Sequence, residues 1–261
     1  MSSGLDGLVD VHTHIVPESF PDYIGRHFGA PWPSVATAQA CHRHVMVSGS
    51  VYRTVSHQCW DCAQRRADMN GIAGNVNGTV IGDPRFLPFF QAAVELDAAV
   101  FVHPLRPAAM DRLVGPAALE QVLAFPGETG LAAASMITGG TFAGAPGLRI
   151  AFSHGGGTLS TLLPRLQHAW HVLPQVRQAI PLNPLQAARQ MYFDDLVYDA
   201  ATIHGIIGVF GFTQVMAGSD YPFTIMDPDP AARLAGLGLG TEALDLLRSA
   251  NAMRWLGRDA S

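Results

Sequence analysis

Short apolar runs alternate with longer amphipathic stretches along most of the chain, and this alternation predicts strands and helices in turn. Four apolar runs have the composition of buried strands: 98–104, 148–154, 191–198 and 213–220. Stretches with helical spacing lie at 86–96, 119–137, 158–172 and 203–209, the second broken at Pro126. Strands that alternate with helices indicate a parallel sheet covered by helices.

The amino-terminal part follows a different pattern. Residues 9–16 form another apolar run, which predicts the first strand, and residues 17–33 are rich in proline and glycine, which favours a long loop. Residues 45–47 and 51–55 flank a glycine turn and predict a small β-hairpin. We therefore expect one domain over residues 1–261, a TIM-type (β/α) barrel with an insertion at 17–60 after the first strand.

The spacing of the strands departs from a complete barrel. Only 89 residues separate His14 from His103, whereas four strand-helix units and the insertion would need about 170. Residues 71–75 resemble a fourth strand and its loop, so we predict that the second and third βα units are absent. A sheet shortened in this way has open edges and exposed apolar faces.

Composition supports one globular domain and limits its partners. The chain has 261 residues, 48% of them apolar and 14% charged, enough for one barrel with a sizeable core. Its formal net charge is −5 and no block of lysine or arginine occurs. This charge pattern argues against binding to nucleic acid or to an anionic membrane.

The chain shows no targeting or membrane-spanning signal. Its first residues lack the basic start and apolar stretch of a signal peptide, and no run of about 18 apolar residues occurs. Three cysteines fit a reducing compartment better than a disulfide framework, and we interpret the Cys59/Cys62 pair as ordinary thiols. We therefore expect a cytoplasmic protein.

Ionisable side chains gather where the predicted strands end. His12 and His14 share one face of the first strand, while His103, His154 and Asp220 each follow a buried run. A His-x-His pair alone is more often incidental, but a barrel brings all these exits to one mouth. The pattern therefore predicts a metal site. His42 and His44 repeat the same spacing, and we assign them to a solvated loop.

Imidazoles with one carboxylate suit zinc, and are also compatible with iron, cobalt or manganese. A catalytic site needs an open position, so one of the five side chains is better placed as a proton-transfer group. We select His154, because three glycines follow it and leave room for a substrate, and because an imidazole outside the metal shell can carry a proton. A structural histidine closing a strand is the alternative.

Several motifs together resemble the metal-dependent decarboxylase branch of the amidohydrolase superfamily, of the aminocarboxymuconate semialdehyde decarboxylase type. They are the segments His12–His14, 102–104, 152–157, 163–166 and 218–223, with Tyr52-Arg53 and 58–61 in the insertion. The resemblance extends over nearly the whole chain from Leu8.

This resemblance implies a function for each candidate residue. His12, His14, His103 and Asp220 correspond to zinc ligands, and His154 to the acid/base. Arg53 and Arg165 correspond to residues that bind substrate carboxylates. The second of them reaches a neighbouring subunit, so the resemblance implies a homodimer. A guanidinium fork suits both roles, because it binds a carboxylate through two hydrogen bonds and keeps its charge.

Three functions follow from these observations. The first is a zinc-dependent decarboxylase acting on a small unsaturated or aromatic carboxylic acid. The second keeps the metal but hydrolyses an ester, lactone or amide, or hydrates its substrate; the two arginine positions argue against it. The third is a catalytically impaired remnant that serves as an interaction module, which the missing units suggest.

Overall fold

The computed structural model describes residues 7–13, 33–39, 42–47, 49–56, 71–105, 107 and 110–258. These residues belong to two compact units. The first unit comprises Met1–His12, Met69–Ser219 and Asp227–Ser261, and the second comprises Thr13–Asp68 and Asp220–Met226.

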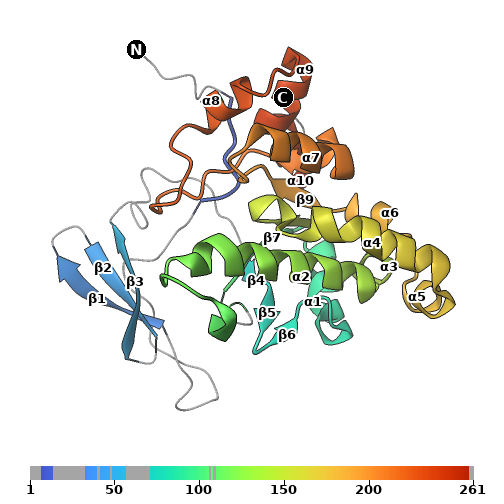
Figure 1. Ribbon diagram of the computed structural model, residues 1–261, viewed down its shortest axis with the longest axis horizontal. Helices are drawn as coiled ribbons and strands as arrows, with labels where there is room; N and C mark the ends of the chain where they lie inside the picture. Colours follow the sequence, from blue (N-terminus) through green and yellow to red (C-terminus); the bar gives the residue numbers. More distant parts are fainter. Residues whose placement is uncertain are drawn as a thin grey trace. The chain divides into compact units, whose positions relative to one another are not determined.

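A five-stranded parallel sheet forms the centre of the first unit (Figure 1). Its strands lie in the order β10-β9-β8-β7-β4. Their bounds are β4 (Gly71–Ala73), β7 (Ala99–His103), β8 (Arg149–Phe152), β9 (Tyr192–Asp194) and β10 (Val215–Met216). The strand-helix alternation of the sequence thus produces the expected parallel sheet.

Residues 9–13 of the first predicted strand form no regular strand, but their backbone is hydrogen-bonded to the segment that follows β10 and to Arg248. The backbone N–H of Val11 donates to the carbonyl of Ala217, and that of Val9 donates to the carbonyl of Arg248. The segment that carries His12 is therefore hydrogen-bonded to the segment that follows β10, as the first strand of a barrel would be to the eighth.

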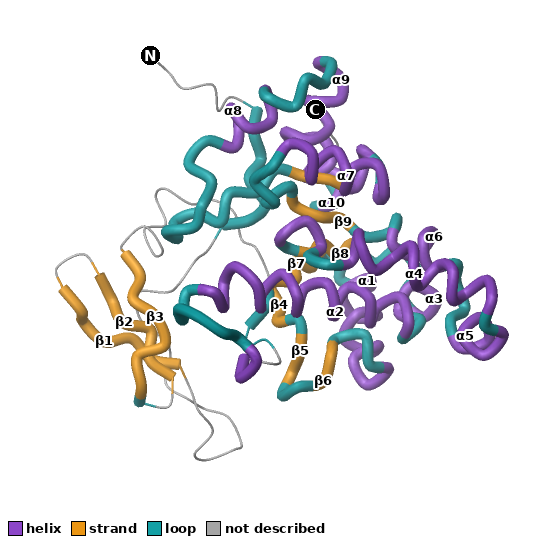
Figure 2. The backbone as a smooth tube through the Cα atoms, viewed as in Figure 1, coloured by secondary structure: helices purple, strands orange, loops and turns teal. Residues whose placement is uncertain are grey.

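Helices cover the sheet and complete the first unit (Figure 2). Two π-helical turns, Glu120–Ala124 and Leu246–Ala250, precede α2 and α10. Pro126 lies at the start of α2, where a helix tolerates the missing N–H of proline. The predicted break therefore coincides with the junction between the π-helical turn and α2. The helices are α1 (Leu87–Glu95), α2 (Phe125–Thr138), α3 (Thr141–Gly144), α4 (Leu159–Val172), α5 (Pro174–Ala179), α6 (Pro184–Ala188), α7 (Ala200–Phe210), α8 (Pro230–Ala235), α9 (Thr241–Asp245) and α10 (Asn251–Trp255).

Both faces of the sheet are apolar. Along β7, Val102 packs in the cluster beneath the covering helices, with Met136 of α2 and Leu163 of α4. Its neighbour Phe101 points to the opposite face and packs with Trp255. Burial on both faces is typical of a parallel sheet and explains why these strands appear in the sequence as continuous apolar runs.

A short hairpin follows β4 and consists of β5 (Asn75–Val76) and β6 (Thr79–Val80). Its turn residues Asn77 and Gly78 both have positive φ, as a two-residue hairpin turn requires. The Asn75 side chain accepts a hydrogen bond from the Gly78 N–H and donates one to Glu128, which ties the hairpin to α2.

The second unit contains a three-stranded antiparallel sheet with strands β1 (Pro33–Gln39), β2 (His42–Val47) and β3 (Ser50–Ser56). The predicted hairpin corresponds to β2 and β3 and is confirmed. The assignment of His42 and His44 to a loop is wrong, because both lie in β2, where the His44 Nδ1 bonds to the Thr54 hydroxyl at 2.8 Å. Residues 17–32 and 57–60 of the predicted insertion lie outside the described part of the chain.

None of the helices in the described residues combines the length and apolar character needed to cross a membrane.

Candidate metal centre

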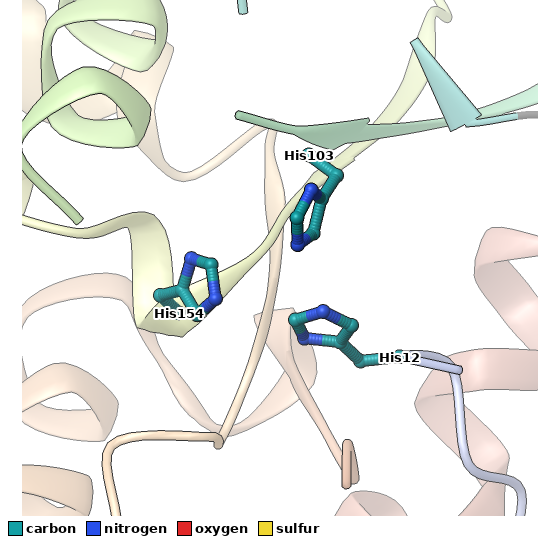
Figure 3. Close-up of side chains that lie close together, drawn as sticks. All are labelled: His12, His103 and His154. Carbon is teal, nitrogen blue, oxygen red and sulfur yellow. The ribbon is translucent and has the colours of Figure 1, made fainter. Parts of the chain in front are cut away.

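The structure brings together three of the predicted histidines. His12, His103 and His154 each offer one ring nitrogen, and these atoms lie within 4.8 Å of one another (Figure 3). They come from three separate places in the sheet: the segment beside β10, the end of β7 and the turn after β8. Figure 3 shows the three rings turned toward a common space.

His12 is fixed by a carboxylate far away in the sequence. Its Nδ1 lies 2.6 Å from Oδ2 of Asp194, the last residue of β9, and both side chains are buried. A carboxylate can only accept from this nitrogen, so Nδ1 carries the proton and Nε2 presents a lone pair. This carboxylate–histidine arrangement is the one that orients metal-ligating histidines in proteins.

His103 has an equivalent constraint from the backbone. Its Nδ1 lies 2.9 Å from the carbonyl oxygen of Pro104, which also can only accept. The Phe125 ring at the start of α2 packs edge-on against the imidazole, with 5.8 Å between ring centroids. The Nε2 of His103 is therefore also the basic nitrogen, and its ring is held from two sides.

His154 differs from the other two in its partner. Its Nδ1 lies 3.1 Å from the hydroxyl of Ser153, a group that can donate or accept. Its backbone is left-handed, with φ of 55°, an uncommon conformation for a residue with a side chain. The backbone N–H donates to Oδ2 of Asp194 at 3.0 Å, and this bond holds the unusual turn in place.

Asp194 is the residue that organises this centre. Its two oxygens accept from the His12 ring and from the backbone N–H groups of His154, Gly155 and Leu196. Burial by itself raises the pKa of Asp194, but the hydrogen bonds of the His12 ring and of the Gly155 N–H help to hold this pKa below its ordinary value. Asp194 is therefore a carboxylate, and its charge favours cation binding at the cluster.

The glycines after His154 are needed for packing. A Cβ on Gly156 would lie 2.6 Å from the Phe193 ring, and one on Gly157 would lie 1.9 Å from the Pro126 carbonyl oxygen. The turn thus fits closely between β9 and α2. The space that we expected these glycines to leave for a substrate is occupied, at Gly156 and Gly157, by the protein itself.

A second carboxylate positions the backbone of His12. Oδ1 of Asp10 accepts from the backbone N–H groups of His12 and Ser219, each at 3.1 Å, and its other oxygen accepts from the Ser219 hydroxyl. Burial raises the pKa of Asp10, and the hydrogen bonds of Ser219 and His12 oppose this effect. Asp10 thereby links the segment that carries His12 to Ser219, three residues beyond the end of β10.

Arg233 forms a network of ion pairs and hydrogen bonds that includes Asp195, the residue next to Asp194 in the sequence. The Arg233 guanidinium donates to Oδ1 of Asp195 at 2.6 Å, to the carbonyl of Gly218 at 2.9 Å and to Asp227. Oδ1 of Asp195 also accepts from the N–H of Gly218 at 2.9 Å. This network fixes the chain after β10, the part of the first unit that precedes Asp220.

The donor set fits a divalent transition metal. Nε2 atoms of two histidines are held in the basic form by fixed acceptors, and a third imidazole lies beside them. Imidazole nitrogens are ligands that zinc, iron, cobalt and manganese all accept, so these residues fit a divalent ion without selecting one.

The other predicted site residues are placed as follows. His14 lies outside the described residues, and Asp220 belongs to the second unit, so their roles as ligands stay predictions. Arg53 belongs to β3, but its side chain is also outside the description. Arg165 is exposed on α4.

Sequence reasoning did not find Asp10, Asp194, Ser153 or Arg233. A signal existed for one of them: Asp194 and Asp195 interrupt the apolar run of the predicted strand 191–198, and the observed strand β9 ends at Asp194. Asp10 lies two residues before His12 and Ser153 directly before His154, and the sequence contains nothing that distinguishes them from ordinary strand residues.

The chain is similar to several known decarboxylases. The chain is 24% identical to a 2-amino-3-carboxymuconate-6-semialdehyde decarboxylase from Dictyostelium discoideum, a match that covers 96% of this chain and 92% of the relative. Seven other curated decarboxylases match over 33% to 46% of their own length, so the chain spans less than half of each of them.

Two solved structures share the fold. The 5-carboxyvanillate decarboxylase of Sphingomonas paucimobilis superposes with a TM-score of 0.65 at 24% identity, over 74% of this chain and 59% of that one. A dihydroxybenzoic acid decarboxylase from Polaromonas sp. JS666, solved with bound manganese, gives a TM-score of 0.57 at 20% identity, over 69% and 55% of the chains.

The comparisons confirm the predicted family and place the relatives of this chain among its decarboxylases. The match to the family model extends over residues 71–258, from β4 to the end of the described chain, and includes His103, His154 and Asp194. This protein therefore belongs to the amidohydrolase family.

Proposed function

We propose that this protein is a zinc-dependent decarboxylase of a small unsaturated or aromatic carboxylic acid. The observation that carries the proposal is the cluster of three imidazoles within 4.8 Å, two of them locked with Nε2 as the basic nitrogen. Relatives named for the decarboxylation of carboxylic acids support this reaction.

The metal is proposed to be zinc. His12 and His103, with His14 and the Asp220 carboxylate as further predicted ligands, form the nitrogen-rich set that zinc prefers. One related structure contains manganese, so both ions belong in any test. When bound, a divalent ion supplies a Lewis acid that stabilises negative charge developing on the substrate.

His154 is proposed to transfer the proton. Decarboxylation breaks the bond between a carbon and its carboxylate, leaves the electron pair on that carbon and releases CO₂. The carbon then needs a proton, and the imidazolium form of His154, held at the edge of the cluster, can supply it and is left as the neutral ring. The hydroxyl partner of His154 suits this task, because the bond between the Ser153 hydroxyl and Nδ1 can form in either protonation state.

Substrate binding is assigned to Arg53 and Arg165. A dicarboxylate or a hydroxylated acid offers the planar oxygens that a guanidinium binds through two hydrogen bonds. Arg165 is exposed on α4, where it is accessible to a second copy of the chain. A homodimer with shared sites is therefore part of the proposal, as is a cytoplasmic location.

We further propose that the parallel sheet is a TIM-type barrel that lacks two βα units. Starting from the segment of Val11, the strands follow in the order β10, β9, β8, β7 and β4, which corresponds to barrel strands one, eight, seven, six, five and four. The match to the Dictyostelium relative runs over 330 aligned positions, 69 more than the chain contains. Two βα units of about 30 residues account for most of this difference.

Two other functions remain to be separated from this one. A hydrolase or hydratase could use the same histidines, and a catalytically impaired remnant could result from the missing units. The first would act on substrates without releasing CO₂. The second would not hold a metal after purification and would not take one up.

Metal analysis combined with a CO₂-release screen tests the proposal. The purified chain is loaded with Zn²⁺ or Mn²⁺ and mixed with amino- and hydroxy-substituted aromatic or unsaturated acids. About one ion per chain and CO₂ release that His103→Ala abolishes are expected. His171→Ala is the matched control, because His171 is exposed on α4 beside Gln167, outside the cluster. Turnover of an ester or lactone without CO₂ release, or a chain that takes up no metal, would contradict the proposal.

A further inference from the structure

The hydroxyl partner of His154 belongs to a short chain of buried groups. Ser153 Oγ lies between Nδ1 of His154, at 3.1 Å, and Oγ1 of Thr129 on α2, at 3.4 Å. Both hydroxyl residues are completely buried. Within the described residues, the Ser153 and Thr129 hydroxyls have no other hydrogen-bond partners.

The direction of these hydrogen bonds determines where His154 carries its proton. If the Ser153 hydroxyl donates to Nδ1, the neutral ring carries its proton on Nε2. If Nδ1–H donates to Ser153 instead, Ser153 must donate to Thr129. The Thr129 proton is then left without an acceptor among the described residues.

The burial of the two hydroxyl groups favours one of these two hydrogen-bond directions. A buried hydroxyl proton without an acceptor is unfavourable, because water cannot reach it. When Thr129 donates to Ser153 and Ser153 donates to Nδ1, both hydroxyl protons are bonded. The same ring then carries its proton on Nε2, which lies on the side of the cluster.

We propose that Ser153, with Thr129 behind it, is a positioning residue that keeps His154 in the Nε2–H tautomer. His12 and His103 have the opposite tautomer, because Asp194 and the Pro104 carbonyl require Nδ1–H. The two locked rings thus present lone pairs for a cation, while the Nε2–H of the neutral His154 ring presents a hydrogen-bond donor to the substrate. The inference rests on the proposed role of His154 as proton donor.

Ring-nitrogen NMR of the full chain tests this directly. Protein with ¹⁵N-labelled histidine is measured at one pH well above the usual histidine pKa of about 6.5, both metal-free and loaded with diamagnetic Zn²⁺. The His154 signals are identified by their loss in His154→Asn. We expect His154 to show the Nε2–H pattern in both forms, and His12 and His103 to show Nδ1–H. An Nδ1–H pattern for His154 overturns the inference, even if CO₂ release is observed.

Variants separate positioning from mere structural support. Ser153→Ala should lose the single-tautomer pattern of His154 and lower kcat about 10- to 100-fold with little change in KM, while the metal is retained. Ser153→Thr keeps the hydroxyl and should restore the tautomer. Ser135→Ala is the matched control, because Ser135 is a buried serine bonded to Gly82 and Ala132 on α2, outside this chain of groups. A Ser153→Ala protein with an unchanged tautomer would contradict the proposal.

Discussion

The Nδ1 atom of His12 lies 2.6 Å from Oδ2 of Asp194, although 182 residues separate them in the chain. The same carboxylate oxygen accepts from the backbone N–H of His154, so one atom of Asp194 holds two members of the histidine cluster. Asp194 thus joins three parts of the first unit: the segment that carries His12, the end of β9 and the turn after β8. The arrangement of the candidate metal centre therefore depends on a residue outside the predicted ligand set.

Replacing Asp194 tests this dependence. Asp194→Asn should lower the affinity for Zn²⁺ about 10- to 100-fold, because the amide removes the charge and need not accept from His12. Zinc titration of the metal-free chain measures the effect. Asp199→Asn is the control, since Asp199 is an exposed cap of α7 and asparagine caps helices equally well. Equal affinities of the two variants would exclude a metal-orienting role for Asp194.

Two histidine variants distinguish ligand from proton donor. His103→Ala should lose most of its bound metal, because the Nε2 of His103 is committed as a lone-pair donor by the Pro104 carbonyl. His154→Ala should keep its metal and lose turnover by about 10²- to 10⁴-fold, the usual contribution of a positioned proton-transfer group. Metal content and kcat are measured on the same samples. A metal-free His154→Ala protein would make His154 a ligand.

A buried carboxylate gives the stability of the protein a distinctive pH dependence. Burial raises the pKa of Asp195 to about 7, although Arg233 and the Gly218 N–H oppose this effect. At Asp195 the folded state then holds a proton that the unfolded chain releases near pH 4, so the contribution of Asp195 to the free energy of unfolding falls as the pH rises from about 4 to 7. The slope is about 1.4 kcal/mol per pH unit.

Urea unfolding of the metal-free chain at several pH values measures this slope. Asp195→Asn cannot ionise, so its stability should change less over this range than that of the wild type. A wild-type free energy that rises through the same range would show that Asp195 is ionised when folded, with Arg233 as its counter-ion.

The glycine turn after His154 allows a paired test of packing. Gly157→Ala should destabilise the chain by about 2 kcal/mol or more, because φ is 57° and the new Cβ would lie 1.9 Å from the Pro126 carbonyl oxygen. Gly205→Ala, on the exposed side of α7 with nothing within 4 Å, should stabilise it by about 0.5–1 kcal/mol. Thermal unfolding of both variants checks the opposite signs. A tolerated Gly157→Ala would mean that α2 can move away from the turn.

The strand exits could be predicted from the sequence because each apolar run ends visibly in an ionisable residue. His103 and His154 were found in this way, and His12 through its spacing to His14. The contact between His12 and Asp194 could not be predicted, since it depends on which strands become neighbours, and strand order leaves no local pattern in the sequence. The protonation of each ring depends in turn on such contacts.

The same limit applies to the insertion and to the glycines. The alternation around Ser48–Ser50 predicted β2 and β3, but β1 has neither the apolar nor the β-branched density that identifies a strand from its sequence. Glycines 155–157 signalled a close approach, but their spacing could not tell whether a substrate or the protein itself fills the space. Phe193 and the Pro126 carbonyl fill it at Gly156 and Gly157.

The proposed homodimer makes a quantitative prediction for mixed chains. Arg165 follows His154 by eleven residues, most of them in α4, and is exposed. The seven residues from Leu159 to Arg165 are in α4 and span about 10 Å of helix at 1.5 Å per residue, which takes the side chain away from its own cluster. If Arg165 serves the partner's site, a dimer of one Arg165→Ala chain and one His154→Ala chain has one site with both defects and one site with neither.

Random exchange of the two inactive variants makes half of the dimers mixed, each with one intact site of two, so about a quarter of the wild-type activity should return. Subunits are exchanged under mild denaturant, and the mixed dimers are verified by a mass or affinity tag on one chain. The control mixes Arg165→Ala with Arg165→Ala,His154→Ala, because neither site of that dimer has its arginine. Verified mixed dimers with no more activity than the separate variants would mean that Arg165 acts within its own chain or has no part in the reaction.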